Sequence, residues 1–491
     1  MTTGSFLAFD LGASSGRAML GRLAEGRIAI RELHRFPNEM VELGGHLHWN
    51  IVQLYQEIKQ GMKLCVAQGE ARPEGLALDT WGVDFGFLAA DGSLLALPFA
   101  YRDPMTNGAP EEFFKRVPRS RVYELTGIQF MQINTLFQLC ALVRDRWPPL
   151  GVADAFLMVP DLLNYLLTGT RKTEFTIATT SQLYNPVKQD WEEELLTALG
   201  LPRMMMQEIV PPGTVIGDLR PAVAAETGLG SVPVIATTSH DTASAVAAVP
   251  AEGTDWAYIS SGTWSLVGFE SGRPVITKQA LDLNVTNEGG VGGTFRVLKN
   301  VTGLWLVQEC RSSWAREREY GYGELAEMAT AAPPFAALVD PDHASFLNPA
   351  EMPEAICRYC AATGQQRPAG PAEFMRCILE SLALKQRMVL EQLRELRGRP
   401  FETVHIIGGG SQNETLCQFT ANATGLPVLA GPVEATAVGN LLVQALGLGH
   451  ITSLAELREV VRRSFPLRRY EPANTAAWDS AYARFRELIS R

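Results

Sequence analysis

The sequence lacks any apolar run long enough to cross a membrane. Its 491 residues include no stretch near the ~20 consecutive apolar residues of a spanning helix, and no basic region precedes the short apolar run in MTTGSFLAFD, which argues against a signal peptide. Basic residues are also too few for a nucleic-acid binder, because 43 Lys and Arg stand against 53 Asp and Glu, a net charge of −10. We therefore expect a cytoplasmic protein of small-molecule chemistry, with no nucleic-acid or membrane partner, and its oligomeric state stays open.

Cysteines are few and scattered. The chain has seven, an odd number that fits no disulfide framework and favours a reducing compartment. Cys357 and Cys360 form a single C-x-x-C with no second pair at the spacing of a zinc site, so a metal role is disfavoured there. A disulfide between Cys377 and either of these residues stays open.

The composition is that of a globular protein with 46% hydrophobic and 20% charged residues, and the length predicts two to four domains. Apolar runs broken by Gly, Ser and Thr turns predict three antiparallel strands in residues 1–36, and the same pattern returns over residues 256–276. This recurrence favours an internal duplication. We predict an α/β fold of two domains, residues 1–250 and 251–491, with a catalytic cleft between them.

The segment DLGASSGR, residues 10–17, joins a carboxylate at a strand end to small residues whose backbone amides can converge on phosphate. Asp10 is a candidate ligand for magnesium, and Arg17 is a candidate for a charge-assisted contact to phosphate. A plain hairpin turn is the alternative. The segment also fits the hydrolase pattern G-x-S-x-G, but a strand pattern follows Ser14 where that motif requires a helix, so a hydrolase is disfavoured. The small residues of this turn are Ala13, Ser14, Ser15 and Gly16.

Two further glycine-containing segments suit a nucleotide. The turn at 260–263 repeats the first one, and the loop 408–410 lies between a predicted strand, 403–407, and a predicted helix, 413–424. Asn413 takes the place of the third glycine of G-x-G-x-x-G, so dinucleotide binding is disfavoured. No G-x-x-x-x-G-K-[ST] occurs, and any use of ATP must employ a fold other than that of the P-loop proteins.

Two acidic segments indicate a sugar site. His240 and Asp241 stand at the predicted start of a helix of small residues, where Asp241 either takes a proton from an alcohol or merely caps the helix. The segment DTWGVDFG, residues 79–86, combines an aromatic ring, a glycine and carboxylates, which suits a polyhydroxylated ligand. The alternative for that segment is a core tryptophan followed by a bulge at Gly82.

Taken together, these residues resemble the FGGY carbohydrate kinases of the actin-like ATPase superfamily. The resemblance covers essentially the whole chain and implies two duplicated actin-like ATPase (ribonuclease H-like) domains. The segments that carry it are AFDLGASSGR (8–17), DTWGVDFG (79–86), YRDPMTNG (101–108), GIQFMQINTLFQL (127–139), TSHDTASAV (238–246), YISSGTWSLVGFE (258–270), NEGG (287–290), KNVTGLWL (299–306), IIGGGSQN (406–413) and AGPVEATAVGN (430–440).

The resemblance also implies roles for individual residues. Asp241 would be the catalytic base, and Asp10 would orient Mg²⁺. The residues implied to bind ATP are Ala13, Ser14, Ser15, Gly16, Arg17, Thr263, Gln308, Gly408, Gly409 and Gly410. The residues implied to bind the sugar are Gly82, His240, Asp241, Thr242 and Asn300. Residues 311–370 are less familiar, and their roles stay open.

The segments 79–86, 238–246 and 258–270 are similar to those of family members that act on L-rhamnulose. The resemblance thus implies transfer of the γ-phosphoryl group of Mg-ATP to the C1 hydroxyl of that sugar. The alternatives are another ketose kinase of the family, for L-fuculose or a pentulose, and an actin-like ATPase without sugar kinase activity.

Overall fold

The computed structural model describes residues 3–69 and 72–490. The chain divides into two compact units. The first contains Met1–Ala248, Glu270–Val297 and Ala435–Ser464, and the second contains Val249–Phe269, Leu298–Glu434 and Phe465–Arg491. The two domains predicted from the sequence, residues 1–250 and 251–491, stay a prediction. The compact units differ from these domains mainly because Glu270–Val297 and Ala435–Ser464 belong to the first unit.

The first unit is built on a six-stranded sheet in the order β13-β14-β6-β1-β2-β3. Strand β1 pairs antiparallel with β2 and parallel with β6, while β2 and β3 are antiparallel. The three predicted amino-terminal strands are therefore confirmed. The bounds are β1 Gly4–Leu11, β2 Ser15–Ala24, β3 Arg27–Pro37, β6 Gly75–Thr80, β13 Thr214–Asp218 and β14 Pro233–Ala236.

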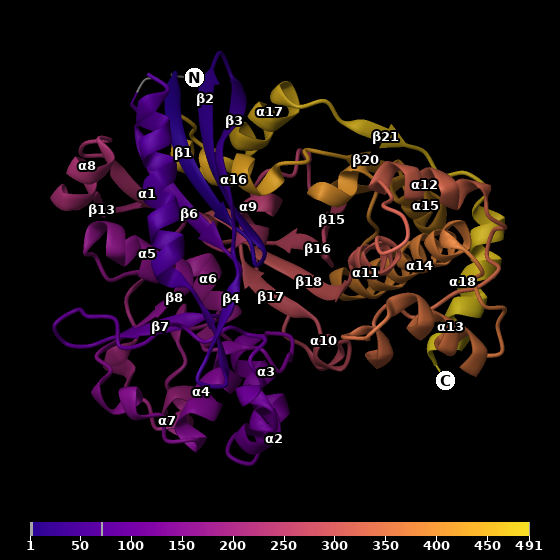
Figure 1. Cartoon of the computed structure of the whole chain (residues 1–491), viewed down its shortest axis with the longest axis horizontal. Coiled ribbons are helices and arrows are strands. Elements are labelled where there is room, and N and C mark those ends of the chain that lie inside the picture. The colour runs from indigo at the N-terminus through magenta and orange to yellow at the C-terminus, as the bar shows by residue number, and fades with distance from the viewer. Residues whose placement is uncertain (1–2, 70–71, 491) are drawn as a thin grey trace. The chain divides into compact units, whose positions relative to one another are not determined.

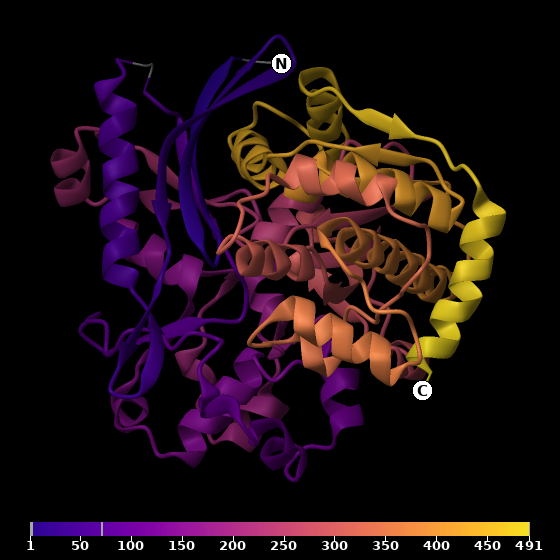
Figure 2. The ribbon, with the colours of Figure 1, turned by 45° about the vertical axis from the view of Figure 1, so that its right-hand side comes forward.

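Helices cover both faces of this sheet (Figure 1). Leu7, Phe9 and Leu11 of β1 share a core with α1 (Ile51–Ala67) and α5 (Val159–Thr168). On the opposite face, α16 (Ala435–Gly447) contacts β1 and β6 and packs against α9 (Asp241–Ala247). Because side chains alternate along a strand, Asp10 points toward the face covered by α9 and α16. Figure 2 shows the same arrangement of α1 and the first three strands from a second direction.

Smaller elements complete the first unit. Four two-stranded sheets pair β4 with β5, β7 with β8, β9 with β12 and β10 with β11. Their bounds are β4 Met40–Leu43, β5 His46–Trp49, β7 Phe85–Leu88, β8 Ala155–Met158, β9 Thr173–Glu174, β10 Tyr184–Asn185, β11 Asp190–Trp191 and β12 Ile209–Val210. The remaining strand and helices are β17 Thr286–Gly289, α2 Ala109–Phe114, α3 Arg119–Thr126, α4 Thr135–Arg144, α6 Phe175–Thr180, α7 Glu193–Leu199, α8 Pro221–Thr227, α10 Lys278–Asp282 and α17 Leu454–Ser464.

The second unit is built on strands in the order β18-β16-β15-β19-β20-β21. Strand β18 crosses the boundary between the units, so its residues up to Val297 belong to the first unit and those from Leu298 to the second. Strand β15 pairs antiparallel with β16 and parallel with β19, then β19 and β20 are parallel and β20 and β21 antiparallel. The first sheet has the same succession from β2 through β1, β6 and β14 to β13, so the predicted duplication is confirmed. The bounds are β15 Trp256–Ser261, β16 Trp264–Ser271, β18 Phe295–Thr302, β19 Thr403–Ile407, β20 Val428–Ala430 and β21 Arg468–Tyr470.

The helices of the second unit form a core around α14 (Pro371–Arg397), which packs against α12 and α15. Apolar residues at helical spacing over residues 372–396 predict a long helix that ends at Gly398. This prediction is confirmed, and Gly398 has a φ of 75°, which only glycine adopts readily. The predicted strand at 403–407 and the helix after the glycine loop are also confirmed, with Asn413 as the N-cap of α15. The other helices are α11 Trp305–Trp314, α12 Tyr322–Ala331, α13 Met352–Ala362, α15 Glu414–Thr424 and α18 Thr475–Ile489.

One predicted strand is wrong. Residues 275–276 were expected to complete the second meander, but they form no strand, and β18 takes the place beside β16. The reason is local: Val275 N donates to Asn287 Oδ1 (2.5 Å), and Asn287 Nδ2 donates back to Val275 O (3.2 Å). A side-chain amide thus replaces a neighbouring strand as the hydrogen-bond partner.

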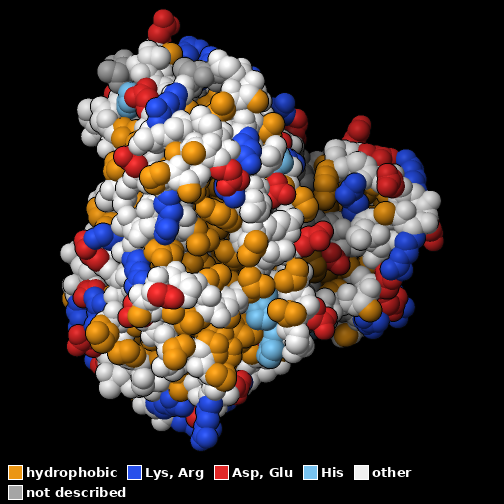
Figure 3. All heavy atoms as spheres, turned by 60° about the vertical axis from the view of Figure 1, so that its left-hand side comes forward, with side chains coloured by type: hydrophobic (Ala, Val, Ile, Leu, Met, Phe, Trp, Pro, Cys, Tyr) orange, Lys and Arg blue, Asp and Glu red, His pale blue; other side chains and the backbone are white. Residues whose placement is uncertain are grey.

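No helix among the described residues is long and apolar enough to cross a membrane. On the face shown in Figure 3, basic and acidic side chains are interspersed around a broad apolar area. The exposed large apolar side chains of the first unit include Leu43 on β4 and Val52 and Val66 on α1.

Candidate functional site

The first phosphate-turn candidate is the hairpin between β1 and β2. Asp10 stands opposite Arg17 in the antiparallel register, and Arg17 Nη2 lies 2.5 Å from Asp10 Oδ2. Asn38 holds the turn from outside, since Asn38 Nδ2 donates to Gly12 O (2.8 Å) and Asn38 N to Ser14 O (3.1 Å). The turn is therefore fixed through two of its carbonyl groups.

Asp79 lies beside Asp10, because the two residues are partners in the parallel pair of β1 and β6. It is fully buried; Asn440 Nδ2 of α16 donates to its Oδ2 (2.6 Å), whereas its Oδ1 has no hydrogen-bond partner. Burial first, and then the charge of Asp10, raise the pKa of Asp79 well above its usual range. The sequence singled out the segment that contains Asp79 but gave this carboxylate no role in the phosphate region.

Asp241 is the first residue of α9, and the N-cap is His240. The alternative in which Asp241 is the N-cap is therefore wrong, because His240 holds that position. Asp241 Oδ1 accepts hydrogen bonds from Thr242 N (2.6 Å) and Thr242 Oγ1 (3.1 Å), and its side chain is 30% exposed. Burial, and next the charge of Asp10, raise its pKa to about 7. A carboxylate with these properties can accept a proton near neutral pH.

The carboxylates of Asp10, Asp79 and Asp241 act on one another electrostatically within the first unit. A divalent cation would relieve this repulsion, and the buried Oδ1 of Asp79 lacks a partner. The described residues contain no group of three or more His, Cys, Asp or Glu that could hold a metal ion. Mg²⁺ needs only one or two carboxylates, because it keeps several waters and binds substrate phosphates. The residues present therefore fit Mg²⁺.

The segment at 79–86 is tightly packed. A Cβ on Gly82 would lie 3.2 Å from the Thr180 side chain of α6, so close packing favours glycine there. Trp81 is 6% exposed and belongs to the core, as the alternative interpretation expected. Asp84 is fully buried and accepts hydrogen bonds from Trp49 Nε1 (2.5 Å) and Trp81 Nε1 (2.9 Å), while burial raises its pKa to about 7. Asp84 thus orients two indole rings beneath the segment.

In the second unit, the turn between β15 and β16 meets the start of α11. Thr263 Oγ1 donates to Gln308 Oε1 (3.1 Å), and Gly303 N donates to Thr263 O (3.0 Å). Two of the predicted nucleotide contacts, Thr263 and Gln308, are therefore neighbours.

The loop 408–410 lies against the same turn, because β15 and β19 are parallel partners. A Cβ on Gly410 would lie 2.0 Å from Ser261 Oγ, and Gly408 has a φ of 79°. Both positions require glycine for structural reasons. A Cβ on Gly409, by contrast, would meet nothing within 4 Å. Ser261 Oγ is buried without a hydrogen-bond partner, so the turn and the loop leave one polar atom unsatisfied where they meet.

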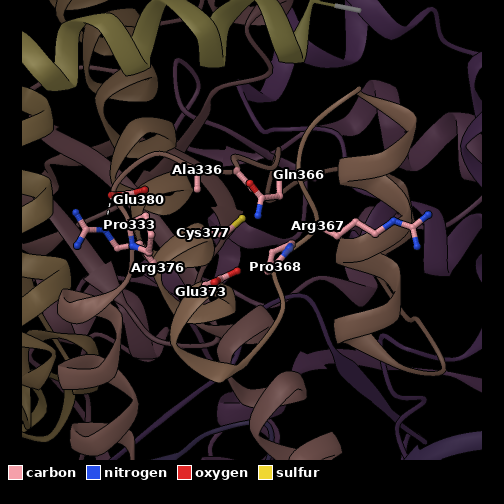
Figure 4. A pocket seen from close by; sticks show the side chains of 10 residues that line it. Pro333, Ala336, Gln366, Arg367, Pro368, Glu373, Arg376, Cys377 and Glu380 are labelled. Atoms are coloured by element: carbon pink, nitrogen blue, oxygen red, sulfur yellow. Dashed lines mark hydrogen bonds and ion pairs between the residues drawn. The ribbon is translucent and has the colours of Figure 1, made fainter.

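Asn300 lies on β18 in the second unit and is half-buried. A pocket elsewhere in that unit is lined by none of the predicted site residues (Figure 4). Cys377 lines it together with Arg376 and Glu380, which form an ion pair (2.5 Å). All seven cysteines are free thiols, so the disulfide left open for Cys377 is absent.

Comparison with known proteins identifies the class. Models of the FGGY family of carbohydrate kinases match residues 5–248 (N-terminal domain) and 257–448 (C-terminal domain). The chain belongs to the FGGY family of carbohydrate kinases, enzymes that transfer a phosphoryl group from ATP to a sugar.

Two similar proteins both carry the name rhamnulokinase. A rhamnulokinase from Bacteroides thetaiotaomicron is 51% identical over 485 residues, covering 99% of each chain. A rhamnulokinase from Pectobacterium atrosepticum is 43% identical over 491 residues, covering 99% of this chain and 97% of the relative. Among solved structures, a xylulose kinase from Lactobacillus acidophilus has a TM-score of 0.84 at 15% identity and covers 99% of this chain and 98% of its own. This likeness shows that the chain has the fold of that kinase.

Sequence reasoning missed two charged residues close to His240. Arg296 Nη2 lies 3.0 Å from His240 Nδ1 and 3.1 Å from Glu288 Oε2. The available signal was the single charge inside the apolar strand FRVL, residues 295–298, because a charge in a buried strand needs a partner or a function.

Proposed function

We propose that this chain is an L-rhamnulokinase, which transfers the γ-phosphoryl group of Mg-ATP to the C1 hydroxyl of L-rhamnulose and yields L-rhamnulose 1-phosphate and ADP. One observation carries the choice of sugar: the identity of 51% to the Bacteroides rhamnulokinase over 99% of both chains. The arrangement of carboxylates in the first unit supports phosphoryl transfer to an alcohol.

Asp241 is the proposed base. Its carboxylate accepts the proton of the attacking hydroxyl, and its pKa of about 7 suits a base at neutral pH. His240 and Thr242, its neighbours in the chain, contact the sugar together with Gly82 and Asn300. Phosphoryl transfer depends mainly on positioning and on stabilising charge, so these residues chiefly hold the hydroxyl in line with the phosphate.

The nucleotide contacts fall into two groups. In the first unit, the turn from Ala13 to Arg17 binds phosphate oxygens, and Asp10 holds Mg²⁺ directly or through a water. In the second unit, Thr263, Gln308 and the loop 408–410 bind the rest of ATP. When bound, Mg²⁺ neutralises charge on the phosphates. Arg17 adds positive charge next to Asp10, because Arg17 Nη2 lies 2.5 Å from Asp10 Oδ2.

ADP release measured over a panel of acceptors tests the proposal. The panel holds L-rhamnulose, L-fuculose, L-xylulose, L-ribulose, glycerol and no acceptor. L-rhamnulose should give the highest kcat/KM, because the relative that is 51% identical to this chain is named a rhamnulokinase. A clear preference for another ketose would overturn the choice of sugar and leave the family intact. ATP hydrolysis unaffected by any sugar would contradict a kinase.

Gly409→Val tests the nucleotide loop. The added side chain enters open space in the protein, so the fold should be unchanged, while the approach of a phosphate or ribose to the backbone is blocked. We expect KM for ATP to rise about tenfold or more, equivalent to ~1.4 kcal/mol, with melting temperature unaltered. Gly272→Val is the matched control, because a Cβ there also meets nothing within 4 Å. Equal ATP kinetics in the two variants would show that residue 409 does not approach the nucleotide.

A further inference from the structure

A fully buried arginine contacts the proposed sugar-binding histidine. Arg296 on β18 has no exposed surface; its Nε donates to Gly289 O (2.9 Å) and its Nη2 to His240 Nδ1 (3.0 Å). Glu288 on β17 completes the group, with Oε2 3.1 Å from Arg296 Nη2 and 3.4 Å from His240 Nδ1. All of these residues belong to the first unit.

The contact from Arg296 fixes which nitrogen of His240 carries the proton. A guanidinium group is always protonated and has no acceptor. Since Arg296 Nη2 can only donate at 3.0 Å, His240 Nδ1 must accept. A neutral histidine with Nδ1 as acceptor carries its proton on Nε2, and Nε2 lies 3.4 Å from Asp241 Oδ1. The donor of His240 is therefore on the side of the proposed base.

The backbone of His240 is also held. His240 N donates to Thr176 Oγ1 (3.2 Å), and Thr176 Oγ1 in turn donates to the buried Glu174 (2.6 Å). Glu174 also accepts from Ser239 N (3.1 Å). Because both the ring and the backbone are fixed, His240 has little freedom to choose another orientation.

The buried group of His240, Arg296 and Glu288 is not an arrangement that stability of the fold would favour. Burial, and then the charge of Arg296, lower the pKa of His240 well below its usual range, so the ring stays neutral. Arg296 Nη1 is buried without a hydrogen-bond partner, and a buried donor without a partner is destabilising. A buried ion pair is often no more stabilising than apolar residues of equal volume. A positional role explains the cost.

We propose that Arg296 is a positioning residue that holds His240 as the neutral tautomer with its proton on Nε2, so that this N–H donates to a lone pair of the acceptor sugar beside Asp241. Glu288 offsets the charge of Arg296. The inference rests on the proposed function for the identity of the ligand, a hydroxyl or carbonyl oxygen of a sugar. The tautomer itself does not depend on which sugar is bound.

Arg296→Met removes the donor and keeps much of the volume. Arg458→Met is the matched control, since Arg458 is also a buried arginine of the first unit and is paired with Glu270 (3.0 and 3.1 Å). We expect Arg296→Met to lower kcat by about 10- to 100-fold, the range known for groups that orient metal-ligating histidines, and to leave KM for ATP within about twofold. The control should keep kcat near the parent value.

The tautomer is read directly by long-range ¹H–¹⁵N NMR of histidine-labelled protein, with the His240 signals assigned by their loss in His240→Gln. The groups that face His240 are Asp241, Glu288 and Arg296. In the parent, His240 should remain the Nε2–H tautomer from about pH 6 to 8. In Arg296→Met, it should become a tautomer mixture or titrate within that range. Arg296→Lys, which keeps the charge and one donor, should give an intermediate spectrum and serves if the Met variant does not fold.

An Nδ1–H tautomer in the parent, or an unchanged His240 spectrum in a folded Arg296 variant, would overturn the inference. These outcomes are separate from failure of the proposed function: another preferred sugar in the acceptor panel changes the ligand while the NMR result stands. Equal losses of kcat in Arg296→Met and Arg458→Met, accompanied by equal losses of melting temperature, would assign Arg296 to stability only.

Discussion

Asp241→Asn should lower kcat by about 100- to 10,000-fold, because it removes the proton acceptor while keeping the shape of the side chain. An asparagine oxygen can still accept the hydrogen bond that Thr242 N now donates to Asp241 Oδ1. Sugar binding, measured by calorimetry, and melting temperature should therefore remain near the parent values. The effect should appear in turnover alone.

The pH dependence adds a second criterion. A base must be ionised, so kcat/KM of the parent should fall as the pH drops below about 7, the pKa of Asp241. Asp241→Asn should lose this dependence along with its activity. Asp103→Asn is a suitable control, because Asp103 is a buried aspartate of the first unit that accepts hydrogen bonds from Met105 N (2.8 Å) and Leu47 N (2.7 Å). Near-parent turnover in a folded Asp241→Asn protein would exclude Asp241 as the base.

Gly439→Ala should both destabilise the protein and reduce turnover. A Cβ on Gly439 of α16 would lie 1.8 Å from Ser244 O of α9, and a backbone carbonyl cannot rotate away as a side chain does. The two helices must separate, which costs ~1–3 kcal/mol for typical overpacking. Since α9 begins at Asp241, its displacement also moves the proposed base, and a shift of about 1 Å can lower kcat on the order of 100-fold.

Calorimetric melting and steady-state kinetics on one preparation measure both effects. Gly323→Ala is the control, because Gly323 also lies in a helix, α12, where a Cβ would meet nothing within 4 Å. It should leave turnover unchanged and raise stability by up to about 1 kcal/mol, since alanine loses less conformational entropy on folding. A Gly439→Ala protein with parent stability and turnover would contradict the close contact of α9 and α16.

Local patterns in the sequence predicted much of the fold. Apolar runs broken by turns predicted β1 to β3, helical spacing predicted α14, and the glycine at 398 marked its end. These elements follow from residues within a few positions of one another, so their signal is local. The carboxylate at the start of α9 was also recognisable from its own segment.

For Gly16, the fold gives a different reason for glycine from the one that the sequence suggested. Its place in a phosphate turn is still a prediction, but a Cβ there would lie 2.3 Å from the ring of Phe36. Packing between β2 and β3 alone therefore requires glycine at this position. A larger residue at 16 would disturb the sheet before it reached any nucleotide.

The sequence by itself supplied the candidates for the chemistry, because resemblance and local pattern predict roles for Asp10, Asp241 and the glycine loops. Only the tertiary structure decided which side chains lie against the candidate residues. The parallel register sets Asp79 beside Asp10, and α16 brings Asn440 to Asp79. Strand β18 places Arg296 against His240. These partners are separated by many residues in the chain, and strand pairing and helix packing, which depend on the whole fold, bring them together.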